Sequence, residues 1–286
     1  MFIVDKTESP GSSHKHTEDR VGFSGNIAWV IDGATDPTNS QALPALSDVQ
    51  WLVDFLHERL TEMGASHIKQ SASALIEQLG TLTEKAIAAI APRGLDIYPC
   101  SSIGIAICDG DVIHLGRIGD ATLIAYHDGH LTHELSTSFF ESREAQAVSQ
   151  SLTDRQTESD IVQAMLTRRL EYIRGEHSET VFSGHPERSF KVYAKTLSIH
   201  DVDEILMCTD GFARAVVDYA ILPDWLTLKL YADALGLASV TSRIRDFEAQ
   251  RTRGERSTKF KHADDLAAIK LEVTKGAIHG WPRSPR

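Results

Sequence analysis

The chain has 286 residues, of which 42% are hydrophobic and 24% are charged. This is enough apolar material for a sizeable core, in one large domain or two small ones. The formal net charge of −11 argues against a nucleic-acid-binding protein, which would be expected to present a basic face.

The cysteines and the N-terminal residues indicate a cytoplasmic protein. There are three cysteines, and none forms a Cys-x-x-Cys pair. So sparse and odd a set predicts a reducing compartment and not a disulfide framework. No basic-then-apolar signal pattern occurs at the start, and no apolar run approaches the ~20 residues that span a bilayer.

The first half of the chain predicts a strand, two long helices and then a meander. Residues 26–31 form a short apolar run that is typical of a buried strand. Apolar residues then recur at three- and four-residue steps over 43–63 and over 68–90, which predicts two amphipathic helices. Residues 102–108 and 112–118 are predicted strands on either side of Asp-Gly-Asp, a sequence that favours a hairpin.

The second half mixes strands and helices. It predicts a helical region at 139–174, strands at 190–197, 204–208 and 266–273, helices at 224–235 and 239–250, and a loose tail from 275. No strand–helix alternation runs through the chain, so the predicted class is α+β, a sandwich with an antiparallel core. Neither a G-x-G-x-x-G fingerprint nor a phosphate-binding P-loop occurs.

Four Asp-Gly pairs differ in their setting. Those at Asp109 and Asp128 lie between two predicted strands and are interpreted as hairpin turns. Asp32 and Asp210 instead follow buried strands, just before polar or helical segments. A carboxylate held rigidly at the rim of a core can bind a divalent cation that keeps part of its water shell.

Three further acidic positions also lie next to predicted strands. Asp264 precedes the last strand, Glu18-Asp19 precedes the first, and Asp120 follows the strand at 112–118. Hard divalent ions prefer oxygen ligands, and a pair of them can activate a water and hold phosphate oxygens. The set therefore favours metal-dependent phosphoryl chemistry over a nucleophilic side chain. Consistent with that, no G-x-S-x-G elbow or cysteine phosphatase loop occurs.

In this order and spacing, the acidic motifs resemble those of the metal-dependent, type 2C serine/threonine protein phosphatases, from about residue 17 to residue 273. The matching motifs are Glu18-Asp19-Arg20, Asp32-Gly33-Ala34-Thr35, Gly116-Arg117-Ile118-Gly119-Asp120-Ala121, Thr209-Asp210-Gly211 and Asp264-Asp265. The resemblance implies a four-layer αββα sandwich of two antiparallel sheets flanked by helices. It also implies one catalytic domain over 1–273, followed by a flexible tail over 274–286.

The resemblance implies a role for each acidic residue. Asp32 would bridge two Mg²⁺ or Mn²⁺ ions, and the carbonyl of Gly33 would bind the second. Asp210 and Asp264 would bind the first. The remaining acids would hold bound waters (Glu18 and Asp19) or, together with Asp210, form a third and weaker metal site (Asp120). A water between the first two ions would attack the phosphorus, with Asp19 in the catalytic set.

Two departures from the family pattern stand near this site. Many members carry an arginine before the Glu-Asp pair, and this chain has His14 and Lys15 there. Either could bind the substrate phosphate without an arginine's bidentate geometry, and His14 could instead donate a proton to the leaving oxygen. A solvated polar loop is the alternative reading. Asp265 replaces a frequent asparagine and adds negative charge, which would either tighten metal binding or weaken the approach of phosphate.

Two basic segments remain open between a functional and a surface reading. Residues 170–189 fall where the family carries a flap beside the active site, and they are either a substrate-contacting flap or a variable surface loop. Residues 251–262 carry five Lys and Arg side chains. They form either a solvated face or a basic path that draws an acidic phosphopeptide toward Asp264.

The expected function is hydrolysis of phosphoserine and phosphothreonine on a protein. The expected partner is a phosphoprotein made by a separate kinase, with no nucleic acid and no membrane involved, and the expected state is a monomer. The alternative is a catalytically weak regulator that binds phosphoprotein or metal without turnover, suggested by the missing arginine. A phosphohydrolase with an aspartyl nucleophile would need Asp-x-Asp after the first strand, and Gly33-Ala34 follow Asp32 instead.

Overall fold

The computed structural model of the chain describes residues 1–12, 16–38, 40–143, 157–250 and 263–274. The strands are β1 (Phe2–Ser9), β2 (Asp19–Ser24), β3 (Ile27–Gly33), β4 (Cys100–Asp109), β5 (Val112–Ile118), β6 (Thr122–His127), β7 (His130–Leu135), β8 (Phe182–Ser183), β9 (Tyr193–Ser198), β10 (Glu204–Cys208) and β11 (Leu266–Glu272). The helices are α1 (Asp48–Gly64), α2 (Ala72–Ile90), α4 (Glu158–Ile173), α5 (Asp210–Val217), α6 (Trp225–Leu235) and α7 (Leu237–Gln250), with a further short helical segment at 139–143.

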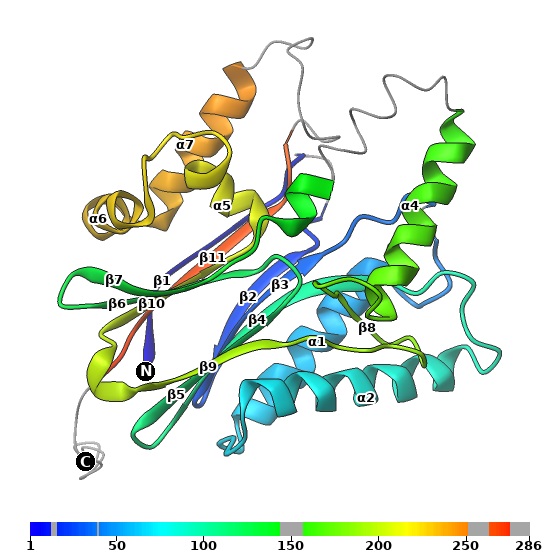
Figure 1. Cartoon of the computed structure of the whole chain (residues 1–286), viewed down its shortest axis with the longest axis horizontal. Helices are drawn as coiled ribbons and strands as arrows, with labels where there is room; N and C mark the ends of the chain where they lie inside the picture. The colour runs from blue at the N-terminus through cyan, green and yellow to red at the C-terminus, as the bar shows by residue number, and fades with distance from the viewer. Residues whose placement is uncertain (13–15, 39, 144–156, 251–262, 275–286) are drawn as a thin grey trace, which may run out of the picture.

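Two antiparallel sheets lie face to face at the centre, and helices cover the outer side of each (Figure 1). One sheet has the order β1-β11-β10-β6-β7. The other has the order β2-β3-β4-β5-β9, and β8 pairs with β4. Helices α1 and α2 lie on the sheet that contains β3, and α5, α6 and α7 lie on the sheet that contains β11 (Figure 1). The predicted four-layer α+β sandwich is therefore confirmed.

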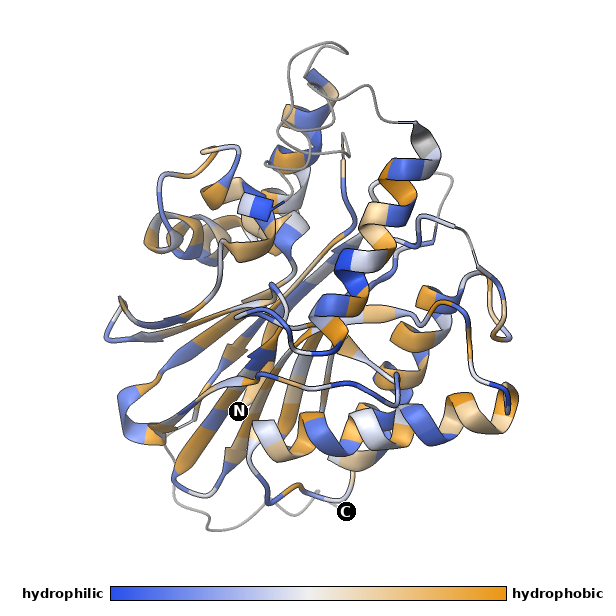
Figure 2. Cartoon of the chain, turned by 45° about the vertical axis from the view of Figure 1, so that its right-hand side comes forward, coloured by the Kyte–Doolittle hydropathy of each residue, from blue (hydrophilic) through white to orange (hydrophobic). Residues whose placement is uncertain are grey.

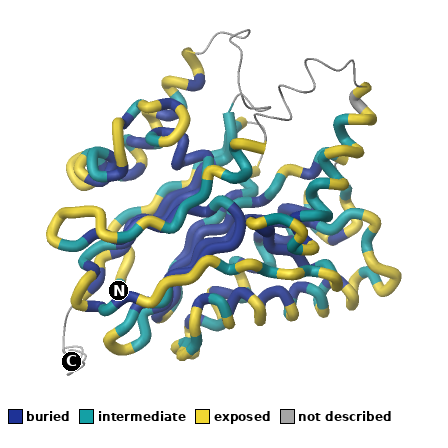
Figure 3. The backbone as a smooth tube through the Cα atoms, viewed as in Figure 1, coloured by how far each residue is buried: buried dark blue, intermediate teal, exposed yellow. Residues whose placement is uncertain are grey.

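The alternation of side chains along β3 explains how one strand serves two layers. Ile27, Trp29 and Ile31 face α1 and α2, whereas Ala28 and Val30 face the other sheet. Successive side chains of a strand point to opposite faces, so a central strand must be apolar on both. Hydrophobic residues accordingly line the central strands in Figure 2, and the same strands are buried in Figure 3.

Serine residues begin both long helices. Ser47 Oγ accepts a hydrogen bond from Gln50 N–H (3.0 Å), and Ser71 Oγ accepts one from Ala74 N–H (3.2 Å). Such N-caps satisfy amide groups that have no partner within the helix. The helices therefore begin at residues 48 and 72, later than the apolar pattern predicted. Leu43 is buried in the preceding loop, where its N–H donates to Asp48 Oδ1 (2.7 Å).

Both Asp-Gly hairpins are confirmed, and four strands and helices that the sequence did not indicate are present. Asp128 and Gly129 both have positive φ, 49° and 75°, as a tight two-residue turn requires. The additional strands and α-helix are β1, β2, β8 and α5. β1 pairs only with β11 within its sheet, at an edge, and it exposes Phe2 and Val4, so no buried periodicity marks it.

Replacing Leu56 with alanine is expected to destabilise the protein by about 3 kcal/mol, because the fully buried side chain would leave a cavity between α1 and the sheet. Leu46→Ala is the matched control, since Leu46 is 64% exposed and its loss should change stability by less than about 0.5 kcal/mol. Urea unfolding followed by circular dichroism measures both. Equal effects of the two substitutions would contradict this assignment of the core.

No helix in the described part of the chain is long and apolar enough to cross a membrane. The domain predicted for 1–273 ends close to the last residue of β11, Glu272. Apart from Thr274, the predicted tail lies outside the described residues.

Candidate active site

Two of the predicted acidic residues face each other at the ends of neighbouring strands. Asp19 begins β2 and pairs in register with Asp32 near the end of β3, and Asp32 pairs in turn with Ser102 of β4. Asp19 is almost fully buried. Strand pairing thus fixes two carboxylates side by side at one edge of this sheet.

A glycine turn brings Asp120 to the same edge. Asp120 follows β5, and Ser102 Oγ donates to its Oδ1 (2.5 Å) while accepting from its N–H (3.1 Å). Gly119 has a φ of 79°, and a Cβ there would lie 2.0 Å from Ser102 Oγ. The turn therefore needs glycine on both conformational and steric grounds.

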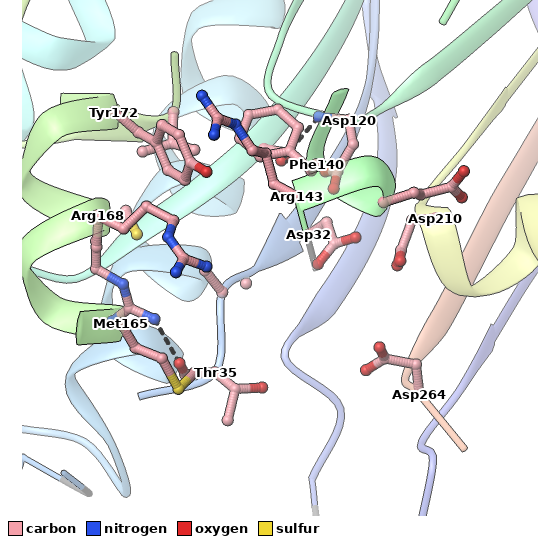
Figure 4. Close-up of a pocket in the computed structure, with 17 residues that line it drawn as sticks. Asp32, Thr35, Asp120, Phe140, Arg143, Met165, Arg168, Tyr172, Asp210 and Asp264 are labelled. Atoms are coloured by element: carbon pink, nitrogen blue, oxygen red, sulfur yellow. Dashed lines mark hydrogen bonds between the residues drawn. The ribbon is translucent and has the colours of Figure 1, made fainter. Parts of the chain in front are cut away.

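The opposite sheet contributes Asp210 and Asp264. Asp210 is the first residue of α5, separated from the end of β10 by Thr209 alone, and Asp264 lies just before β11. Thr209 Oγ1 accepts a hydrogen bond from Ala267 N–H (2.9 Å), which ties the two segments together. Asp32, Asp120, Asp210 and Asp264 consequently surround one space (Figure 4).

This convergence raises the pKa values of Asp19 and Asp32. Burial is the largest cause for Asp19; nearby carboxylates raise its pKa further, and a hydrogen bond with Thr209 opposes them. For Asp32, burial again comes first, followed by repulsion from Asp19, Asp210, Asp120 and Asp264. Within the described residues, the buried Oδ2 of Asp19 has no hydrogen-bond partner. An oxygen-rich, electron-rich cluster with an unsatisfied acceptor fits hard divalent cations.

Glu18 and Gly33 take different places from the aspartates. Glu18 Oε1 accepts from Ser47 Oγ (2.8 Å), and Glu18 does not line the pocket. The Glu18 carbonyl accepts from Gly33 N–H (3.1 Å), and Gly33 does line the pocket. A Cβ on Gly33 would lie 2.7 Å from Val49 Cγ1 and 2.8 Å from the Glu18 carbonyl oxygen, so no larger residue fits without movement.

Asp265 has a structural use that the sequence left open. Its Oδ1 accepts from Gly11 N–H (2.7 Å) and its Oδ2 accepts from Glu18 N–H (2.6 Å). Carboxylates bound by amides make strong hydrogen bonds. Asp265 therefore holds the chain on both sides of the 13–15 segment. His14 and Lys15 themselves lie outside the described residues, and their proposed roles stay predictions.

A cavity of about 400 Å³ opens beside the aspartates. Its far wall comes from α4, with Met165, Arg168, Arg169 and Tyr172 (Figure 4). Arg169 Nη2 donates to the Thr35 carbonyl (2.5 Å), which anchors this helix to the loop after β3. The Arg168 guanidinium points into the cavity toward Asp32 and forms no ion pair with any described residue.

A family model described as protein phosphatase 2C matches residues 13–247. The chain belongs to the protein phosphatase 2C family. The model match ends before Asp264, so the assignment of this residue to the site rests on its position in the structure.

Solved structures of bacterial phosphatases share the fold. The serine/threonine phosphatase PstP of Mycobacterium tuberculosis is 12% identical, with a TM-score of 0.55, covering 94% of this chain and 97% of that one. The catalytic domain of PstP solved with two manganese ions is 13% identical, with a TM-score of 0.54 and coverage of 94% and 97%. Stp1 of Staphylococcus aureus is 13% identical, with a TM-score of 0.54 and 96% coverage of both chains. No curated protein matches this chain.

Within this phosphatase 2C domain, the wall opposite the aspartates comes mostly from residues before the predicted 170–189 flap. Of that flap, only Tyr172 and Val181 line the cavity. The two arginines of this segment pair elsewhere: Arg174 with Glu187 (2.7 Å) and Arg188 with Glu84 (2.6 Å). The basic segment 251–262 lies outside the described residues.

The sequence did not indicate the four arginines that approach the site. Arg143, Arg168 and Arg169 line the cavity, but on a helical region with no distinctive motif. Arg214 contacts Asp264 and Asp210 from α5. Its spacing of four residues from Asp210 would have been a signal only if that helix had been predicted.

A second cluster of possible ligands lies at the opposite end of β6. His127 Nδ1 lies 3.2 Å from Asp203 Oδ2, and His127 Nε2 lies 3.5 Å from Asp128 Oδ2. Asp203 Oδ2 also accepts from Asp128 N–H (2.7 Å). These contacts explain the cluster as a brace for the β6–β7 turn, separate from the aspartate site.

The raised pKa values of Asp19 and Asp32 predict how the stability of the metal-free phosphatase domain depends on pH. The pKa of each carboxyl is higher in the folded chain than the value of about 4 that it has in the unfolded chain. Their protonation therefore stabilises the fold at low pH, and this contribution is lost as pH rises through the elevated folded-state values. In EDTA, the denaturation midpoint of Asp19→Asn should respond less to pH than that of the wild type. An equal response would contradict the prediction.

Proposed function

We propose that this phosphatase 2C chain hydrolyses phosphoserine and phosphothreonine on proteins with the help of two Mn²⁺ or Mg²⁺ ions, and a third at a weaker site. The observation that carries the proposal is the convergence of Asp19, Asp32, Asp120, Asp210 and Asp264 at one end of the sandwich, beside an open cavity. Bound there, the ions would supply activation of a water and neutralisation of phosphoryl charge.

The residues divide into ligands and positioning groups. Asp32, Asp210, Asp264 and the Gly33 carbonyl are the proposed ligands of the first two ions, and Asp120 belongs to the third. Asp19 Oδ2, buried and without a partner among the described residues, offers an acceptor for a water hydrogen. Glu18 is placed on this list by family resemblance, and its carboxylate also caps the start of α1 through Ser47.

Arg168 is proposed to bind the substrate phosphate, in the role that the missing N-terminal arginine plays elsewhere. Its guanidinium enters the cavity from α4, across from Asp32 (Figure 4). A planar guanidinium matches the geometry of phosphate oxygens. Arg168→Ala is therefore expected to raise KM for a phosphothreonine peptide by roughly tenfold while leaving Mn²⁺ affinity unchanged.

The matched control is Arg174→Ala, at the end of the same helix. Arg174 is exposed, pairs with Glu187 and does not line the cavity, so KM should not change. Steady-state kinetics on the peptide and calorimetric titration with Mn²⁺ give the two quantities. An unchanged KM in Arg168→Ala would leave the phosphate-binding role to another residue.

The deciding experiment for the whole proposal is hydrolysis of a phosphothreonine peptide with and without Mn²⁺, alongside Asp210→Ala. Metal-dependent phosphate release that is lost in the variant supports the proposal. Activity retained by the variant contradicts the assigned site. Peptide binding without release, in folded and metal-loaded protein, would favour the alternative of a phosphoprotein-binding regulator.

The physiological setting follows from the same proposal. The substrate would be a cytoplasmic phosphoprotein made by a separate serine/threonine kinase, and the phosphatase would act as a monomer. The three free cysteines are consistent with a reducing compartment.

A further inference from the structure

We propose that Arg214 is a built-in cation that competes with the divalent ion at Asp210 and Asp264, so that of the two main metal sites this one fills second. The inference rests on the proposed metal-dependent function. It concerns the order and strength of metal binding, which can be measured without an activity assay.

Arg214 is fixed between the two carboxylates. Its Nη2 lies 2.7 Å from Asp264 Oδ2 and 3.5 Å from Asp210 Oδ2. The side chain is only 3% exposed, and Tyr219 hydrogen-bonds it while also bonding Glu248 (2.9 Å). Arg214 stands four residues after Asp210 on α5, so the helix itself aims the guanidinium back at the acid.

These contacts use the oxygens that an ion would need. Asp264 Oδ2 accepts from Arg214, and Asp264 Oδ1 accepts from Asp265 N–H (3.1 Å). Mg²⁺ binds carboxylate oxygens at about 2.0–2.1 Å and tolerates little distortion. An arginine cannot lose its charge in a protein. An incoming ion must therefore displace at least one guanidinium contact and tolerate a fixed positive charge beside it.

In the described part of the chain, no cation is ion-paired with the opposite half of the cluster. Within the described residues, neither Asp19 nor Asp32 forms an ion pair with a lysine or arginine. Asp19 Oδ2 has no hydrogen-bond partner there either. Mutual repulsion among the carboxylates around Asp32 therefore favours binding of the first metal ion there. At Asp264 the negative charge is already partly neutralised by Arg214. This difference sets the order of filling.

The test is calorimetric titration of the full chain with Mn²⁺, comparing wild type with Arg214→Gln. Wild type is expected to show a tighter and a weaker class of site. Glutamine keeps a hydrogen-bond donor but removes the charge, and should tighten the weaker class by about tenfold or more without changing the other. Unchanged or weaker binding in this variant would overturn the proposal, because Arg214 would then support the ligands instead of competing.

Two controls assign the effect. Asp264→Asn should remove the weaker class, and Arg214→Gln should have no effect in that background; a persisting effect there would overturn the proposal. Arg214→Lys keeps the charge and should retain the wild-type order.

If Arg214→Gln does not fold by circular dichroism, an arginine side-chain NMR titration of wild type with Mg²⁺ decides. The Arg214 signal, assigned with Arg214→Lys, should shift with the second equivalent, and a shift with the first would overturn the inference.

The metal-binding result and the phosphatase assay can fail separately. Two-step binding tightened by Arg214→Gln, in a protein that releases no phosphate, would support the inference and count against the catalytic function. Metal-dependent hydrolysis with a single class of Mn²⁺ sites in the wild type would do the reverse.

Discussion

Asp32→Asn is expected to abolish Mn²⁺-dependent phosphatase activity and, at the same time, to stabilise the metal-free protein. Asp32 is partly buried beside four other aspartates, and their repulsion raises its pKa after the larger effect of desolvation. The neutral amide removes that repulsion but is a poorer ligand for a hard cation. Activity on a phosphothreonine peptide should fall by roughly 100-fold or more, since even outer-shell changes at metal sites cost up to that much.

The matched control is Asp128→Asn. This residue also belongs to an Asp-Gly pair, but it lies in an exposed hairpin turn at the far end of β6. Asp128→Asn should neither lower the activity nor raise the melting temperature in EDTA as Asp32→Asn is expected to do. Activity retained by Asp32→Asn, or a lower melting temperature in EDTA, would remove the basis for placing the metal ions there.

The second large effect is expected from the buried ion pair behind Asp120. Arg117 and Glu179 are 3% and 7% exposed, and both contacts between the guanidinium and the carboxylate are 3.1 Å long. Arg117 also donates to the Gly119 carbonyl (2.6 Å) and the Ser136 carbonyl (2.9 Å). Glu179→Ala should destabilise the chain by about 3 kcal/mol or more, because it leaves a buried charge without its partner.

An exposed pair provides the comparison. Arg174 and Glu187 have side chains that are 41% and 61% exposed, and Glu187→Ala should cost less than about 1 kcal/mol. Denaturant unfolding measures both. The double substitution Arg117→Met with Glu179→Ala should recover part of the loss at the buried site. If both single variants proved equally mild, the turn that holds Asp120 would not depend on this pair.

The sequence predicted those parts of the site that depend on local sequence patterns, and not those that depend on contacts between distant segments. Asp32 and Asp210 could be found because each follows a run of apolar residues that forms a buried strand by itself. Their meeting could be anticipated only through family resemblance, because it needs strands from two different sheets. The pairing of Asp19 with Asp32 also depends on β2, whose polar start shows no strand periodicity.

The basic residues were harder to predict for a physical reason. A guanidinium on a long, flexible stem can serve a distant element, so its partner is set by tertiary packing and not by neighbours in sequence. Arg169 reaches the Thr35 carbonyl and Arg188 reaches Glu84, across more than 100 residues in each case. The partners of Asp265 could not be predicted for the same reason, because the amides that donate to it belong to Gly11 and Glu18, far away in the sequence.

The register between β1 and β11 has a consequence for how the protein is made. Phe2 pairs with Glu272, and Ser9 pairs with Leu266. Asp264 therefore takes its place only when residues 2–9 meet residues 266–272, which is a contact of very high sequence separation. During translation, the early aspartates at 19 and 32 must wait for the last of their neighbours to leave the ribosome. A nascent chain stalled before residue 264 would lack Asp264 and β11, and β10 would be left with an open edge.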